Sequence, residues 1–226
     1  SGGKAAISTS TDATTKLWNL DSGGCTGTLT HDGQASTACA FIKDDQLFVV
    51  GFEDGTLRVW NRRTLKLVET LYGHTAYVTA CAATADGKYL VTTSRDETLR
   101  VWDLASLKLL HTLQRADDPG GPSPRGSEGR RWITALALAA DGKTAFAASG
   151  DGLVSHWNLA SGSLIKPFRV AKDRIDSCAV TPEGYLLCGL ADGTLLIWNL
   201  AEMECVDRLS AHTGSVSACA LTRDGR

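Results

Sequence analysis

The sequence lacks the features that would carry the chain into a membrane or along a secretory route. No apolar run approaches the roughly 18 residues of a membrane-spanning helix, and no charged-then-apolar leader opens the chain. No Asn-x-Ser/Thr acceptor occurs, and the seven cysteines lack the close spacing of a small disulfide framework. Together these absences predict a reducing, cytoplasmic setting.

An excess of charge of one sign is also missing, as is any glycine-rich loop of the kind that binds phosphate. The net charge is −2, which argues against bulk attraction to nucleic acid or to an anionic membrane. The glycines fall instead in turn sequences such as EDGT (53–56) and ADGT (191–194). We therefore expect no cofactor, and neither nucleic acid nor a membrane as partner.

What the sequence does contain is one spacing that occurs five times, an aspartate six residues before a tryptophan. The pairs are Asp12–Trp18, Asp54–Trp60, Asp96–Trp102, Asp151–Trp157 and Asp192–Trp198. The tryptophans follow one another at 42, 42, 55 and 41 residues, and this period indicates a repeat architecture. The long interval contains residues 114–131, which hold three of the five prolines and are predicted to form an inserted surface loop.

Each period holds four short apolar runs separated by turn sequences. In the third unit they are 77–83, 89–94, 99–104 and 107–113. Runs of this length, linked by Asp-Gly or Asp-Glu, are typical of antiparallel strands. Four such strands make one propeller blade, which buries its faces only against other blades. We predict an all-β propeller of four-stranded antiparallel blades with five blade equivalents, either one domain over 1–226 or an arc of a larger ring.

Over nearly its whole length the chain resembles the WD-repeat β-propeller family. The resemblance rests on the Trp-Asn/Asp pairs, on the aspartate six residues earlier and on Gly73-His74. It implies a buried tetrad of His, Ser or Thr, Asp and Trp, which the third repeat supplies as His74, Thr92, Asp96 and Trp102. Other repeats depart from this pattern. The hydroxyl position holds Val50, Ala147 and Cys188, and the His position holds Gly129 and Ala171. Those blades are expected to rely on apolar packing.

Three groups of residues suggest chemistry, but a structural role explains each better. His74, Thr92 and Asp96 have the residue types of a hydrolase triad, yet a nucleophile needs exposure and an oxyanion hole. Four cysteines share one phase of the repeat (Cys39, Cys81, Cys178 and Cys219). They belong to different sheets, whose spacing of about 10 Å is too wide for a shared metal or a disulfide. His156 replaces an aliphatic residue before Trp157 and is expected to be a core or edge histidine. We expect no enzyme and no metal.

The resemblance also implies where a partner binds. Loops that join the fourth strand to the next first strand, and the second strand to the third, share one face, which we call the top face. The insertion 114–131 belongs there. The family's partner-binding positions correspond to Glu53, Thr75, Tyr77, Arg95, Arg130, Trp132, Lys172 and Arg174. This set is net positive, so an acidic or phosphorylated protein segment is the expected partner. Ordinary solvated loop residues are the alternative interpretation.

The amino-acid sequences of the third repeat, from Gly73 to Leu113, and of residues 211–226 resemble those of WD arrays in large, often bacterial, multidomain signalling proteins. There the propeller follows a nucleotide-binding switch domain of the NACHT or NB-ARC type. Two functions are therefore open: a protein-interaction scaffold, and the ligand-sensing, autoinhibitory part of such a switch protein.

The two ends of the chain suggest that the ring closes. The chain starts before a second strand (5–10) and ends after a first strand (215–221), and both ends carry the same turn sequence. Pairing these strands would complete a fifth blade and assemble a second tetrad from His212, Ser8, Asp12 and Trp18. The same arithmetic fits an arc cut from a larger ring or half of a two-chain ring.

Overall fold

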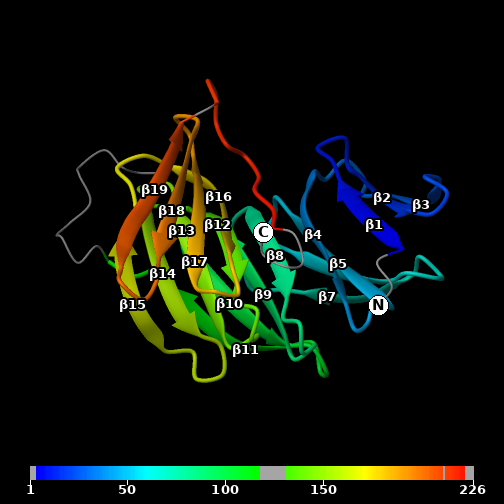
Figure 1. The fold of residues 1–226 in the computed structure, drawn as a ribbon. Helices are drawn as coiled ribbons and strands as arrows, with labels where there is room; N and C mark the ends of the chain where they lie inside the picture. Colours follow the sequence, from blue (N-terminus) through cyan, green and yellow to red (C-terminus); the bar gives the residue numbers. More distant parts are fainter. Residues whose placement is uncertain (1–3, 118–130, 211, 222–226) are drawn as a thin grey trace.

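The fold consists of antiparallel sheets arranged side by side, as the computed structural model shows (Figure 1). The structure describes residues 4–117, 131–210 and 212–221. These residues form 19 strands and no helix, and so none with the length and apolarity of a membrane span. The predicted all-β class is confirmed.

Five sheets follow one another along the chain. The first sheet has three strands, β1 (Ala5–Thr9), β2 (Thr14–Asn19) and β3 (Cys25–Thr30). The second has β4 (Ser36–Ile42), β5 (Leu47–Phe52), β6 (Leu57–Asn61) and β7 (Leu67–Leu71). The third has β8 (Val78–Ala83), β9 (Tyr89–Ser94), β10 (Thr98–Asp103) and β11 (Lys108–Gln114). The fourth has β12 (Ile133–Leu138), β13 (Thr144–Ser149), β14 (Leu153–Asn158) and β15 (Leu164–Arg169). The fifth has β16 (Ile175–Val180), β17 (Tyr185–Leu190), β18 (Thr194–Asn199) and β19 (Glu204–Ser210).

Each sheet with four strands pairs them in chain order, so that short hairpin turns connect neighbours. The aspartate of the repeat shapes one of these turns. Asp96 Oδ1 accepts hydrogen bonds from the Thr98 amide and hydroxyl, at 2.9 and 2.7 Å. Asp12 and Asp54 make the same pair of bonds with the threonine two residues on. An aspartate that satisfies its own turn explains why this residue recurs before the third strand.

A register shift recurs beside each tryptophan of the repeat. In every sheet the pairing between the strand that carries the tryptophan and the outer strand slips by one residue just before it, as between Val101 and Trp102. A bulge of this kind increases strand twist and re-aims a side chain. The tryptophan therefore keeps one phase relative to the turn in all five sheets.

Apolar clusters hold neighbouring sheets together. One cluster joins the second and third sheets through Leu57 and Val59 on one side and Leu90 and Trp102 on the other. Equivalent clusters join the third to the fourth sheet and the fourth to the fifth. The middle strands are buried on both faces, as in β5 and β9, while the outer strands are largely exposed. Stacking between sheets, and not a separate core, therefore supplies the burial.

The predicted closure of the ring is not made within the described residues. Residues 212–221 form no strand, and β1 pairs only with β2. The C-terminal segment lies along the fifth sheet instead, because the Val216 amide donates to Leu190 O at 3.0 Å and Ser177 Oγ donates to Val216 O at 2.7 Å. Figure 1 shows the first sheet set apart from the fifth. The inserted loop also begins later than predicted, because β11 includes Gln114, and its residues 118–130 lie outside the described residues.

Candidate functional site

The third sheet brings its four tetrad residues together. His74 Nδ1 lies 2.9 Å from Asp96 Oδ2, and His74 Nε2 lies 2.9 Å from Thr92 Oγ1. Trp102 Nε1 donates to the same hydroxyl oxygen at 3.0 Å. Histidine, threonine and tryptophan are all buried. The chain of bonds satisfies each buried polar group and ties β9, β10 and the turn between them to the loop that precedes β8.

The environment of Asp96 keeps it ionised. Desolvation by burial would raise its pKa, but hydrogen bonds from His74, Thr98 and the Thr75 amide outweigh this and hold the pKa well below the ordinary value of 3.8. Thr92 is fully buried and already bonded to two partners. Its burial closes it off from a substrate, which a nucleophile must reach, so the arrangement agrees with the structural network that the resemblance implies.

In other sheets the repeated aspartate forms its hydrogen bond or ion pair with a different residue type. Asp54 accepts from Gln34 Nε2 at 2.9 Å, and Asp192 pairs with Arg208 Nη2 at 3.1 Å. Where the hydroxyl is missing, at Val50 and Cys188, the buried Nε1 atoms of Trp60 and Trp198 have no partner among the described residues. These sheets thus lack the continuous network of the third.

Arg115 completes the fourth sheet, although the sequence prediction placed it in the inserted surface loop 114–131. Its guanidinium is buried, pairs with Asp151 and donates from Nε to Ser149 Oγ at 3.2 Å. The residue directly follows β11 and precedes the insertion. The only signal in the sequence was that this arginine lies two residues after the apolar run 107–113.

The second predicted tetrad is only partly assembled. Trp18 Nε1 donates to Ser8 Oγ at 2.9 Å, and Asp12 accepts from Thr14. The backbone of His212 lies instead against the Gly193 turn of the fifth sheet. Within the repeat, His212 therefore corresponds to His74. It lies, however, at the open end of the fifth sheet.

On the top face, three of the predicted partner-binding residues form one stack. The guanidinium carbon of Arg95 lies 4.2 Å from the centre of the Tyr77 ring and 4.6 Å from that of Trp132. Arg95 follows β9, whereas Trp132 immediately precedes β12, so the stack bridges the third and fourth sheets. We call it the aromatic–arginine stack. The Trp132 side chain is 37% exposed.

The remaining predicted residues are spread over the top face. Arg174 makes a two-pronged pair with Asp176, at 2.5 and 3.0 Å, and its cation is thereby occupied. Glu53 and Lys172 are exposed on the second sheet's turn and the loop before the fifth sheet, and Thr75 is exposed beside the tetrad. Arg130 lies outside the described residues.

A clip fixes the described ends of the insertion next to the stack. Arg131 donates to Glu97 at 3.1 Å and to Asp117 at 3.2 Å. These partners lie in the β9–β10 turn and at the start of the insertion. The acidic neighbours raise the pKa of Arg131 despite partial desolvation. The clip joins three segments beside Trp132, and it was not foreseen from the sequence.

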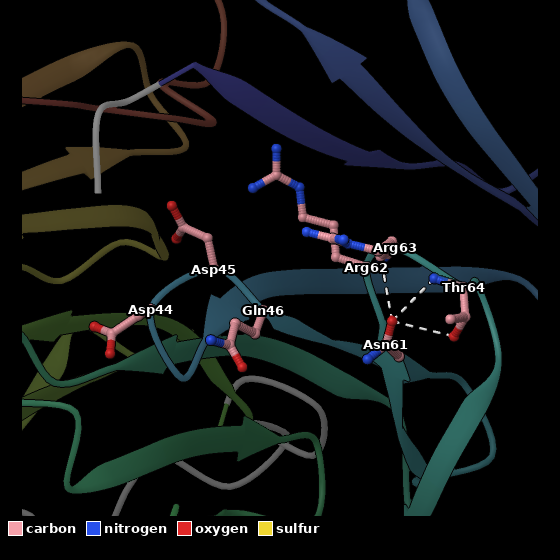
Figure 2. Close-up of a pocket in the computed structure, with 7 residues that line it drawn as sticks. All are labelled: Asp44, Asp45, Gln46, Asn61, Arg62, Arg63 and Thr64. Atoms are coloured by element: carbon pink, nitrogen blue, oxygen red, sulfur yellow. Dashed lines mark hydrogen bonds between the residues drawn. The ribbon is translucent and has the colours of Figure 1, made fainter.

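A hollow lies at the end of the second sheet opposite to the top face, between the β4–β5 and β6–β7 connections. Its volume is about 690 Å³. Figure 2 shows Asp44 and Asp45 on one connection and Arg62 and Arg63 on the other. Lys43, Asp44 and Asp45 have positive φ angles of 50, 53 and 62°. The hollow carries both signs of charge and no exposed aromatic anchor, so it is a weaker candidate for a partner site than the stack.

The described residues show no cluster suited to a metal. No group of three or more His, Cys, Asp or Glu side chains among them can hold an ion. All seven cysteines are free thiols. His156 stacks on Phe146 with ring centres 4.1 Å apart, as a histidine packed in the fold does.

Comparison with known proteins identifies the family. No curated protein matches the chain. The family described as "WD domain, G-beta repeat" (WD40) matches residues 23–61, 65–103, 123–158 and 162–199, more than half of the chain. Among the described residues, three of the matched segments cross a sheet boundary; residues 65–103, for example, contain the outer strand β7 and the inner strands β8, β9 and β10. WD40 domains generally bind protein partners and are generally not catalytic. The chain belongs to the WD40 repeat family.

Proposed function

We propose that this chain is a non-catalytic interaction scaffold that binds a partner protein or peptide on its top face. The aromatic–arginine stack carries the proposal. It places two aromatic rings and an arginine, the residue types that dominate binding energy at interfaces, at one exposed point. The neighbouring clip at Arg131 keeps the surrounding loops in register.

The stack favours an acidic or phosphorylated group in the partner. The Arg95 guanidinium lies over both the Tyr77 ring and the Trp132 ring, and its N–H groups remain to bind a partner. No hydrogen bond from these N–H groups to a described residue is formed. An arginine held flat in this way offers a planar fork that fits a carboxylate or phosphate, and little side-chain entropy is lost on binding.

A display library of peptides with Asp, Glu or phosphoserine tests the proposal directly. Arg95→Ala and Trp132→Ala should each weaken binding of selected peptides about tenfold or more. Arg95→Lys keeps the charge but loses the planar fork, so it should also weaken binding. Arg63→Ala is the matched control, since Arg63 is exposed on the opposite face. Binding that survives Arg95→Ala and is lost in Arg63→Ala would move the site to the other face.

The alternative is that the propeller senses a ligand for a NACHT- or NB-ARC-type switch protein. It is supported by the amino-acid sequence of the third repeat, Gly73 to Leu113, which resembles the WD arrays of such switch proteins. The discriminating observation is the parent gene: a P-loop sequence encoded upstream favours the sensor, and its absence leaves the scaffold. The free thiols suit the cytoplasm, where either function would operate.

A further inference from the structure

The fifth sheet has a cavity beside Ala171, the residue that corresponds to the tetrad histidine of the third sheet. Ala171 stands four residues before β16, as His74 stands four residues before β8. Their backbones are equivalent, because both carbonyl oxygens pack against the glycine of the preceding sheet's turn, Gly152 and Gly55. Alanine has no side chain beyond Cβ, so the imidazole of the third sheet has no counterpart here.

The space that results opens to the top face. Its volume is about 460 Å³. The lining includes Ala171, Lys172, Asp173, Leu190, Asp192 and Arg208. Leu190 is buried and forms an apolar wall.

Asp192 is the acceptor that the missing ring would use. It stands six residues before Trp198, as Asp96 does before Trp102. Asp96 receives an imidazole nitrogen at 2.9 Å, whereas Asp192 pairs with Arg208, whose side chain is 59% exposed. A solvent-exposed pair of this kind is weak. The Asp192 carboxylate can therefore accept a better-shielded donor.

We propose that this cavity binds an imidazole ring, carried by a histidine of a partner protein, which donates its ring N–H to Asp192. A flat ring between the Ala171 backbone and the Leu190 wall would reach Asp192, the counterpart of the carboxylate that His74 bonds in the third sheet. The site goes beyond the proposed function, because it lies on a different sheet from the aromatic–arginine stack.

The charges around the cavity select against other side chains. Lys172, Arg208 and Arg169 surround the mouth and repel a lysine or an arginine. Asp173 and Asp192 repel a carboxylate or phosphate that enters the cavity. A phenyl ring fits the space but leaves Asp192 without a new donor. A neutral ring with one N–H meets all of these conditions.

Free imidazole is the probe, used at about pH 8 so that the ring is neutral. Backbone amide resonances of residues 170–173 and 190–194 should shift saturably on titration. The melting temperature should rise by about 2–4 °C at a saturating concentration. Asp192→Asn keeps the cavity but removes the charge of the acceptor, and it should weaken imidazole about tenfold.

Two variants give matched controls. Ala171→His fills the cavity from within, so the imidazole-induced shifts should disappear while the variant itself melts higher. His74→Ala opens the equivalent cavity in the third sheet, so a second set of shifts should appear at residues 73–76 and 94–98. If Ala171→His does not fold, Ala171→Leu blocks the same space without a new polar group.

Four results would overturn the proposal. They are no shift in the parent chain, shifts that persist when the cavity is filled, equal binding by Asp192→Asn, and equal shifts with acetate or benzene in place of imidazole. Because the probe requires no partner, these results are independent of the peptide-binding test on the stack.

Discussion

Replacing Asp96 with alanine should destabilise the third sheet more than Asp12→Ala destabilises the first. The carboxylate accepts four hydrogen bonds: from His74 Nδ1, the Thr75 amide, and the Thr98 amide and hydroxyl. His74 and Thr98 are buried, at 6% and 8% exposure, whereas Thr75 is exposed and can bond to water. Alanine therefore strands the donors of two buried residues.

The size of the effect follows from these donors. A buried donor left without an acceptor costs about 1–3 kcal/mol. Two such residues give a loss of about 2–6 kcal/mol in the free energy of unfolding. For a chain of this length about 1 kcal/mol lowers the melting temperature by about 2–4 °C. The expected fall is about 5–20 °C.

Asp12→Ala is the matched control for this measurement. Asp12 makes the same two turn bonds to Thr14, at 2.9 and 2.7 Å, but it is exposed and has no histidine partner. Urea unfolding followed by tryptophan fluorescence, with thermal melts beside it, should show a much smaller loss for Asp12→Ala. Equal losses in the two variants would show that the turn alone matters and that the buried network contributes nothing.

Three further changes test other parts of the fold. Arg115→Leu leaves the buried Asp151 without its guanidinium and should cost about 3–5 kcal/mol in urea unfolding; a loss below about 1 kcal/mol would contradict this. Val50→Thr should give Trp60 Nε1 an acceptor and add about 1 kcal/mol, so a loss in the same assay refutes the reasoning. Burial lowers the pKa of His31, so the unfolded chain takes up this proton at higher pH than the folded chain does. Stability should therefore fall as the pH drops through about 6.5, and His31→Gln should reduce that slope in urea titrations.

The repeat period was enough to predict the strands but not the details of their contacts. Each run predicted in the third unit lies within a residue of β8, β9, β10 or β11, because turn chemistry and apolar runs are local. The bulge before Trp102 depends on pairing with the outer strand, so no local pattern reveals it.

Contacts between segments far apart in the chain could not be predicted from the repeat period. The stacking of Arg95 between Tyr77 and Trp132 depends on the distance between two sheets. Arg115 was missed because the insertion separates it from β12, so position counting pointed to Gly129 instead. The described residues do not make the predicted ring closure, and the count could not decide it, because any whole number of repeats satisfies the same count.

The crossing of sheet boundaries by the family's repeat has a consequence for how such arrays grow. A matched segment begins in the outer strand of one sheet and ends in the third strand of the next, as residues 65–103 do with β7 and β10. Duplication of one such segment supplies an outer strand to the sheet before it and takes one from the segment after it. Each sheet that had four strands still has four in the lengthened array. The gene can therefore gain or lose blades in whole units without exposing a new strand edge, and the number of blades can change while each blade keeps its construction.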